Sequence, residues 1–257
     1  MKQRLVIKVG SNVLTRADGT LNITRISAIV DQIACLRKLR HEVILVSSGA
    51  VASGRSELRV DSHLDSVEQR QLFSAVGQVR LMNLYYDLFR EHGIHVGQVL
   101  TMKENFKEGE QYQNQRACMQ LMLDMGVLPI VNENDTVALT ELMFTDNDEL
   151  SGLIAMMLDA DRLILLSNID GIYDGDPKMP SSQVITIVTQ DMDLSRYIHR
   201  EKSSFGRGGM ESKYHTATEV ARHGITAVIA NGTRENILVD LTLNPGSIPH
   251  TEFIPRS

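Results

Sequence analysis

Clusters of cysteine and histidine, the residues that most often hold structural metals, are missing from this sequence. Cys35 and Cys118 are the two cysteines among 257 residues, and they lie too far apart for a metal-binding or redox pair. The eight histidines show no zinc-ligand spacing either. We therefore expect a reducing compartment, two thiols buried in the core, and no metal site built from protein side chains.

A long apolar run at the amino terminus and a basic patch are missing as well. The first apolar run covers residues 5–9 and contains Lys8, so it is too short and too polar for a signal peptide or a membrane span. The formal net charge is −6, and the lysines and arginines are scattered along the chain. We expect a cytoplasmic protein that binds neither nucleic acid nor membranes.

The sequence does contain a regular alternation of apolar, strand-like runs and longer stretches of helical periodicity. This alternation predicts crossover units on a mainly parallel sheet, so the expected fold class is α/β. The length fits one large domain or two small ones, and no linker separates the units. The tail, 239–257, is expected to form a hairpin and extended chain. The expected strands are 4–9, 42–46, 94–100, 127–131, 162–166 and 226–230, and the expected helices are 69–92, 111–126, 149–159, 210–223 and one capped by Asn22 or Thr24.

Two polar clusters follow the first two expected strands, at the edge where an open parallel sheet binds its ligands. Lys8 lies within an apolar strand, and the next residues, Gly10 and Ser11, let backbone N–H groups approach an anion. The alternative is a strand lysine whose ammonium reaches solvent at the rim of the sheet. Ser48 and Gly49 join the second strand to a helix, and they form either another anion site or a plain helix cap.

A third cluster concentrates acids and amides after a buried strand. It consists of the Asn-Glu-Asn-Asp run at 132–135 and the Asp-Asn-Asp run at 146–148. The cluster suits an ammonium group, and a solvated acidic loop is the alternative, which explains poorly why the first run is fused to an apolar strand. Asp148, at a helix start, can accept hydrogen bonds from lysines and fix where their charges point.

A fourth cluster combines a strand end with a glycine-rich loop. Ser167 and Asn168 end the strand 162–166, and the glycine-rich segment 206–210 precedes Lys213, which would enter the site from the next helix. The glycine-rich segment is neither a Walker A motif nor a dinucleotide fingerprint, so by itself it is weak evidence for a nucleotide site.

Together these motifs resemble the amino acid kinase family, and within it the glutamate 5-kinase branch. The resemblance extends over about residues 2–250, and the segments 75–78 and 94–98 are also similar to stretches typical of the branch. It implies a three-layer α/β/α sandwich and a single kinase domain over 1–257. Many members also carry a C-terminal PUA domain, and we expect none here because the chain ends too early for one. The motifs that carry the resemblance are Lys-Val-Gly-Ser at 8–11, Val-Ser-Ser-Gly-Ala at 46–50, Asn-Glu-Asn-Asp at 132–135, Asp-Asn-Asp at 146–148, and Gly-Gly-Met at 208–210 with Lys213.

The resemblance also implies an activity, the ATP-dependent phosphorylation of the γ-carboxylate of L-glutamate at the start of proline biosynthesis. It assigns the transferring phosphoryl group to Lys8 and Lys213, with Asp148 holding both lysines in place. Glutamate would be bound by Ser48, Gly49, Asp135, Asp146 and Asn147. ATP, with Mg²⁺, would be bound by Lys8, Gly10, Ser11, Ser167, Asn168, Arg207, Gly208, Gly209, Met210 and Lys213.

The implied partners are L-glutamate, proline as a feedback inhibitor, further copies of the chain in a dimer or tetramer, and a glutamate-5-phosphate reductase that takes over the product. Two alternatives stay open. The same fold could act on another carboxylate, such as aspartate or N-acetylglutamate, or the chain could be a non-catalytic amino-acid sensor. A requirement for a free α-ammonium tests the first alternative, and ATP turnover tests the second.

Overall fold

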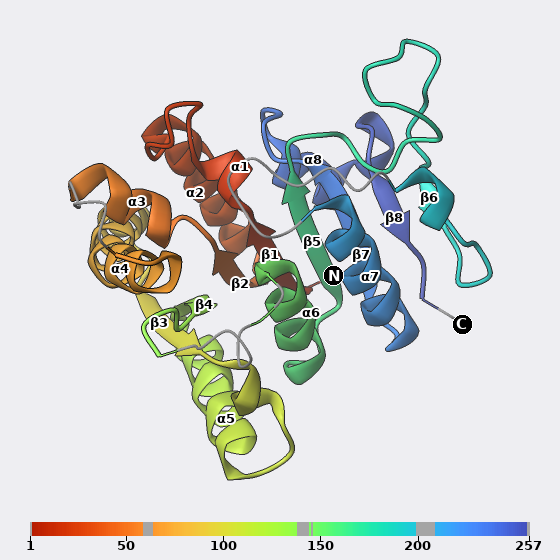
Figure 1. The fold of residues 1–257 in the computed structure, drawn as a ribbon. Helices are drawn as coiled ribbons and strands as arrows, with labels where there is room; N and C mark the ends of the chain where they lie inside the picture. Colours follow the sequence, from red (N-terminus) through yellow and green to blue (C-terminus); the bar gives the residue numbers. More distant parts are fainter. Residues whose placement is uncertain (1, 59–63, 138–143, 145, 199–208, 256–257) are drawn as a thin grey trace.

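The structure, a computed structural model, describes residues 2–58, 64–137, 144, 146–198 and 209–255. Its centre is one eight-stranded sheet in the order β3-β4-β2-β1-β5-β7-β8-β6 (Figure 1). Every pairing is parallel except that of β7 with β8. All six expected strands are present, and β6 and β8 are added to them. The strands are β1 (Arg4–Val9), β2 (Glu42–Ser47), β3 (Val96–Thr101), β4 (Leu128–Glu133), β5 (Arg162–Ser167), β6 (Ile187–Val188), β7 (Thr226–Asn231) and β8 (Thr251–Phe253).

Helices cover both faces of this sheet, which confirms the α/β class and the three-layer arrangement (Figure 1). α2, α4 and α8 pack on one face, and α5, α6 and α7 pack on the other. Two short helices, α1 and α3, directly follow β1 and β2. The helices are α1 (Ser11–Leu14), α2 (Ile23–Lys38), α3 (Ala50–Glu57), α4 (Ser66–Arg90), α5 (Glu110–Asp124), α6 (Asn147–Met157), α7 (Met210–Arg222) and α8 (Ile237–Leu243).

Side chains on β1 alternate between the two hydrophobic cores. Leu5, Ile7 and Val9 pack in the core with α2 and α4, whereas Val6 packs in the core with α6 and α7. Lys8 shares the side of Val6, because residues two apart on a strand point the same way. The strand therefore directs its lysine toward α6 and α7.

The helices begin where side chains accept otherwise unpaired backbone N–H groups. Asn22 Oδ1 accepts the N–H of Arg25 at 3.1 Å, so Asn22 is the cap of α2. α4 begins at residue 66 rather than at 69, because Asp65 and Glu68 form a reciprocal capping box. This earlier start places Arg70 inside the first turns of the helix.

The expectation of a hairpin and extended chain is wrong for the start of the tail, which is helical. Residues 239–243 belong to α8 and Pro245–Ser247 form a short 3-10 helix, whereas extended chain is found later in the tail, in β8. Ile237, Leu238 and Leu241 fall on one helical face, and all three are fully buried. Burial of that face against α2 outweighs the strand preference of the β-branched residues in this segment.

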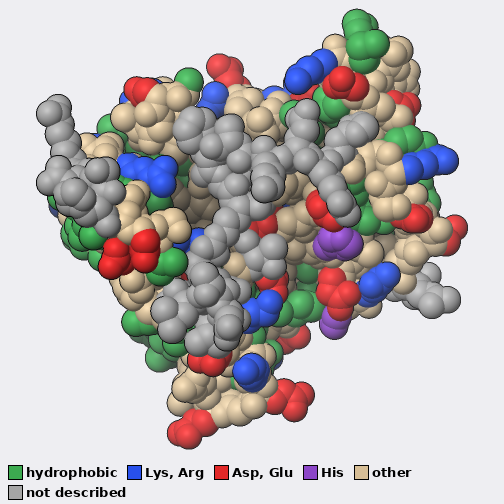
Figure 2. All heavy atoms as spheres, in the orientation of Figure 1, with side chains coloured by type: hydrophobic (Ala, Val, Ile, Leu, Met, Phe, Trp, Pro, Cys, Tyr) green, Lys and Arg blue, Asp and Glu red, His purple; other side chains and the backbone are tan. Residues whose placement is uncertain are grey.

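The expectation of two buried thiols is also wrong. Cys35 is half-buried, and Cys118 is exposed on α5, a helix that buries only Met119 and Leu123. Acidic and basic side chains are interspersed on the face shown in Figure 2. Within the part of the chain that the structure describes, no helix is both long and apolar enough to cross a membrane.

Candidate active site

A cavity of about 720 Å³ lies at the carboxyl edge of the sheet. Its lining comes from the segments that follow β1, β2, β4 and β5 and from α3, α4 and the start of α6. Parallel strands end at the same edge, so polar residues far apart in the sequence meet there. All four polar clusters found in the sequence contribute described residues to this one cavity.

Two buried lysines share one carboxylate beside the cavity. Lys8 Nζ lies 2.7 Å from Asp148 Oδ1, and Lys213 Nζ donates to Asp148 Oδ2 at 2.9 Å. The Asp148 side chain is fully buried at the start of α6, and the Lys8 and Lys213 side chains are 5% and 9% exposed. The structure thus brings together β1, α6 and α7 through the three residues that the sequence motifs singled out.

These two lysines and one carboxylate together carry a net positive charge at a site that is almost shielded from solvent. Burial alone would raise the pKa of Asp148, but the two ammonium groups outweigh burial and hold that pKa below its ordinary value. Burial lowers the pKa of Lys8, the charge of Lys213 lowers it further, and the attraction of Asp148 opposes both. An anionic phosphoryl group at this point would compensate the excess positive charge.

The turn after β2 holds the start of α6 close to the end of β4. Gly49 has a φ of 107°, in the left-handed region that favours glycine, and α3 begins at the next residue. Asn147 Nδ2 donates to Ser48 Oγ and to Asn132 Oδ1, both at 2.9 Å. Asn147 therefore ties together three segments that line the cavity.

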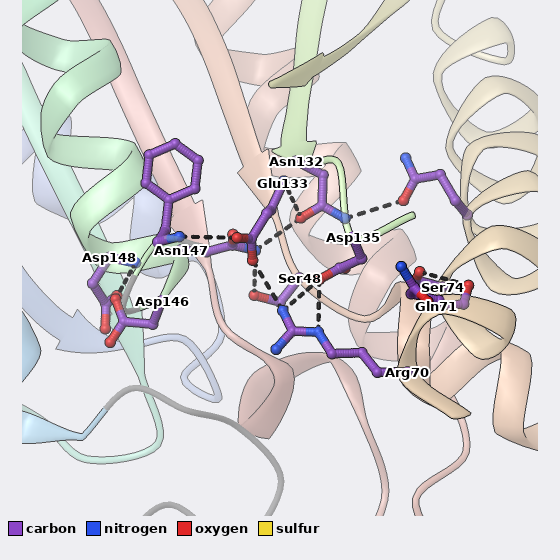
Figure 3. A network of polar contacts seen from close by, with 12 residues as sticks. Ser48, Arg70, Gln71, Ser74, Asn132, Glu133, Asp135, Asp146, Asn147 and Asp148 are labelled. Carbon is purple, nitrogen blue, oxygen red and sulfur yellow. Dashed lines mark hydrogen bonds and ion pairs between the residues drawn. The ribbon is translucent and has the colours of Figure 1, made fainter. Parts of the chain in front are cut away.

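An arginine and two acids form a second charged group on the β4 side of the cavity (Figure 3). Arg70 Nε donates to Asp135 Oδ1 at 2.8 Å, and Arg70 Nη2 donates to Glu133 Oε2 at 2.9 Å and also to Asp135 Oδ1. Burial and the charge of Asp135 raise the pKa of Glu133 to about 7. Burial likewise raises the pKa of Asp135, although the guanidinium opposes the rise.

One carboxylate oxygen of Asp146 caps α6, and the other has no hydrogen-bond donor among the described residues. Oδ1 accepts the backbone N–H groups of Asp148 at 2.8 Å and Glu149 at 3.1 Å. Oδ2 is buried and makes no hydrogen bond to a described residue, although Asp146 lines the cavity. Burial, followed by the charge of Asp148, raises the pKa of Asp146, and the Ser212 hydroxyl offsets only part of that rise. A ligand ammonium would supply the missing donor.

Some of the residues expected to bind ATP line the cavity, and others do not or lie outside the described residues. Gly10, Ser11, Ser167 and Asn168 line the cavity beside Lys8 and Lys213. Gly209 and Met210 lie at the start of α7 and are not among the lining residues, and Met210 packs against the hydrophobic core. Arg207 and Gly208 lie outside the described residues.

Sequence reasoning missed Arg70 and gave Asn132 and Glu133 no individual role. The signal for Arg70 was available in the helical spacing. Residues 73, 77, 81, 85 and 89 form the buried stripe of α4, and position 70 continues this stripe toward the amino terminus. A charged residue on the buried face of a helix needs a buried partner, and Arg70 finds two carboxylates.

Comparison with known proteins identifies the class of protein to which this fold and cavity belong. The model of the amino acid kinase family matches residues 3–231. The chain belongs to the amino acid kinase family.

Two curated relatives share one name. A glutamate 5-kinase from Bacteroides thetaiotaomicron is 64% identical over 260 residues, which cover 100% of this chain and 72% of the relative. A glutamate 5-kinase from Clostridium acetobutylicum is 39% identical, with 99% of this chain and 95% of the relative covered.

Solved structures with the same fold are much less similar in sequence. Carbamate kinase from Giardia lamblia bound to AMP-PNP matches with a TM-score of 0.70 at 16% identity, and the match covers 99% of both chains. UMP kinase from Ureaplasma parvum matches with a TM-score of 0.67 at 18% identity, again over 99% of both chains. At such identities the likeness concerns the fold alone.

Proposed function

We propose that this chain is an ATP-dependent kinase that phosphorylates the γ-carboxylate of L-glutamate, giving γ-glutamyl phosphate and ADP in the first step of proline biosynthesis. One observation carries the proposal. The paired lysines on Asp148 and the acidic group around Asp135 meet at one cavity, where the first suits a phosphoryl group and the second suits an α-ammonium. Family membership and the names of the two curated relatives support it.

The reaction requires neutralisation of charge rather than a general base. The γ-carboxylate is already ionised at neutral pH, so its oxygen can attack the γ-phosphorus directly. A new bond forms from that oxygen to phosphorus while the bond from phosphorus to the ADP oxygen breaks in line with it. Lys8 and Lys213, held on separate oxygens of Asp148, contact the equatorial phosphoryl oxygens and stabilise their charge in the transition state.

ATP enters as its Mg²⁺ complex in this proposal. Among the described residues there is no group of three or more His, Cys, Asp or Glu side chains placed to hold a metal ion. Mg²⁺ commonly keeps several waters and binds substrate phosphates, which would supply its ligands here. The ion, when bound, neutralises part of the phosphate charge.

In this proposal the substrate's α-ammonium faces Asp135, with Asp146 nearby in the same cavity. Asp146 Oδ2 is a buried acceptor without a donor from any described residue, and Asp135 is buried on the β4 side of the same cavity. N-acetylglutamate has no positive charge there and carries extra bulk, so we expect it to be rejected. Aspartate keeps the ammonium but lacks one methylene, so its carboxylate falls short of the phosphorus.

Release of ADP with Mg²⁺-ATP tests this assignment, with hydroxylamine to trap the acyl phosphate and with L-glutamate, aspartate and N-acetylglutamate as parallel substrates. We expect hydroxamate with L-glutamate alone. Turnover of another carboxylate would reassign the substrate. Binding of glutamate without any ADP release would replace the kinase assignment with that of a sensor.

The variant Lys8→Ala tests the mechanism in the same assay. We expect kcat to fall on the order of 100-fold or more, while KM for glutamate changes little, because the lysine acts on the phosphoryl group. Lys103→Ala is a matched control, since this lysine is half-exposed in an ion pair with Glu149 and does not line the cavity. A kcat near that of the wild type in Lys8→Ala would remove Lys8 from the mechanism.

Three partner proposals rest on the family resemblance. Proline is proposed as a feedback inhibitor, copies of the chain as partners in a dimer or tetramer, and a glutamate-5-phosphate reductase as the acceptor of the labile product. Titration of proline at low glutamate tests the first, and an unchanged rate would reject it. Sedimentation velocity tests the second, and coupled turnover with and without the reductase tests the third.

A further inference from the structure

The geometry points to Arg70 as the residue that binds the α-carboxylate of the substrate, so that Arg70 and Asp135 together form a receptor for the main-chain zwitterion of a free α-amino acid. This inference rests on the proposed function and adds to it a residue and a rule of specificity. An α-amino acid carries an ammonium and a carboxylate on one carbon, so its receptor must place an anion next to a cation.

The Arg70 guanidinium has one nitrogen whose donors are not used by any residue that the structure describes. Nε and Nη2 face Asp135 and Glu133, and they are fully engaged in the contacts described above. No residue in the described ranges accepts a hydrogen bond from Nη1. In Figure 3 this nitrogen is the one without a dashed contact. Because the Arg70 side chain is only 22% exposed and lines the cavity, a carboxylate from a ligand is the natural acceptor for Nη1.

The length of the substrate also fits a contact with Arg70. β2 separates β4 from β1, so their carboxyl ends lie about 10 Å apart at a strand spacing of ~4.8 Å. The carboxylate carbons of extended glutamate are about 5 Å apart, from four bonds of ~1.5 Å. The reacting oxygen and phosphorus add about 3 Å. A glutamate whose γ-carboxylate faces the phosphoryl group near Lys8 therefore has its α-carbon at the end of β4, beside Arg70.

A second arginine at the cavity, Arg55, is a weaker candidate. Its guanidinium lies over the Phe73 ring, with the central carbon 5.6 Å from the ring centroid. Arg70, in contrast, is held along one edge by two carboxylates whose side chains are 4% and 8% exposed. A guanidinium fixed in this way loses little conformational freedom when it binds a further carboxylate.

The test compares two ligands in three variants. 4-Aminobutyrate is L-glutamate without the α-carboxylate, and it keeps the ammonium and the reacting carboxylate. KM for L-glutamate and the inhibition constant of 4-aminobutyrate are measured in the wild type, Arg70→Lys, Arg70→Gln and Arg55→Gln. Lysine keeps a positive charge beside Asp135 and Glu133 but has no planar edge left for a third carboxylate. Arg70→Lys therefore separates binding of the substrate's α-carboxylate from positioning of the two acids.

We expect Arg70→Lys to weaken L-glutamate on the order of 10- to 100-fold, the loss typical of a charge-assisted hydrogen bond. In the same variant the inhibition constant of 4-aminobutyrate should change less than about three-fold, so the preference for L-glutamate over 4-aminobutyrate is largely lost. Arg55→Gln should keep this preference. An equal loss for both ligands, or rescue of glutamate affinity by lysine, would overturn the inference and leave Arg70 as a positioning residue for the acids. A collapse of the preference in Arg55→Gln alone would assign the α-carboxylate to Arg55.

The wild type in the same experiment separates failure of this inference from failure of the proposed function. Absence of glutamate-dependent ADP release in the wild type contradicts the proposed function. Normal glutamate turnover with an unchanged ligand preference in both Arg70 variants contradicts only the role of Arg70. Thermal unfolding of each variant shows whether an affected variant is still folded, and Arg70→Lys keeps the test decisive if Arg70→Gln does not fold.

Discussion

Replacement of Asp148 by Asn removes the charge that two buried lysines share, while it keeps the shape of the side chain. Lys8 and Lys213 would remain 5% and 9% exposed without the carboxylate that they share. Loss of one partner from a buried ion pair costs about 3–5 kcal/mol. For a chain of 257 residues this cost lowers Tm by roughly 10 °C. We expect kcat to fall on the order of 10³-fold, since both lysines lose the group that positions them.

In this variant the free energy of unfolding should rise with pH, whereas kcat should fall with pH. Burial already lowers the pKa of Lys8 from 10.5, and without Asp148 that pKa falls further. Between the lowered pKa and 10.5, the unfolded chain binds more protons than the folded chain, so the free energy of unfolding rises with pH. Over the same window the charged form of Lys8 is lost. Since that form attracts the phosphoryl group, kcat should fall as pH rises.

The assay measures Tm and the rate of ADP release from about pH 6 to about pH 9, and each profile is compared with that of the wild type, because Glu133, whose pKa is about 7, also changes charge in this range. Asp87→Asn is the matched control, because Asp87 lies on the surface of α4 with a side chain 66% exposed. The control should behave like the wild type. A variant at position 148 whose Tm and kcat change in the same direction with pH, or whose Tm equals that of the wild type, would refute the reasoning.

Single contacts elsewhere give three more tests. In Gly77→Ala the new Cβ would lie 1.8 Å from a backbone oxygen of α3. We therefore expect urea unfolding to show a free energy of unfolding lower by about 2–4 kcal/mol. In the control Gly246→Ala the new Cβ meets nothing within 4 Å, and the free energy of unfolding should change by less than about 0.5 kcal/mol. The pKa of Glu133 rises from 4.5 to about 7, so its contribution to stability is present below pH 4.5 and is lost as pH rises through 7; thermal melts of Glu133→Gln should lack this decline. Tyr85→Phe removes a hydroxyl 2.8 Å from Ser47 Oγ, and we expect about 1 kcal/mol less stability. An unchanged KM for glutamate in Tyr85→Phe would show that the β2 turn keeps its shape without this contact.

Most of the sheet could be predicted from the sequence because β1, β2, β4, β5 and β7 are buried on both faces, whereas β3 lies at the edge and is partly exposed. Strands that are buried on both faces form short, nearly continuous runs of Val, Ile and Leu, and all six predicted runs are strands in the structure. The alternation with helical stretches then indicates parallel pairing. α8 was mispredicted because its seven residues are rich in strand-forming side chains and too few to show helical periodicity. Its conformation depends on α2, which is about 200 residues away in the sequence.

In the site, as in the sheet, the residues with a local sequence signal could be predicted, and those that depend on contacts between distant segments could not. Lys8 is conspicuous because a charge interrupts a buried strand, and Asp148 because it starts an apolar helix. Both signals are local in the sequence. Arg70 lies on a helix with many charged residues, and its importance depends on where α4 crosses α3. That crossing is made possible by Gly54 and Gly77, at which no Cβ fits. Sequence patterns of one segment do not report such a contact between two segments.

The start of α6 joins the two halves of the site, and this explains why three consecutive polar residues occur there. Asp148 holds the lysines that suit the phosphoryl group, and Asp146 presents a buried oxygen to the cavity. Between them, Asn147 reaches the β2 turn at Ser48 and the end of β4 at Asn132. Because a helix start is rigid once it is capped, these contacts fix the distance between the two reacting groups. A kinase whose substrates are both anions depends on that fixed distance, since the repulsion between the substrates must be overcome before the bond can form.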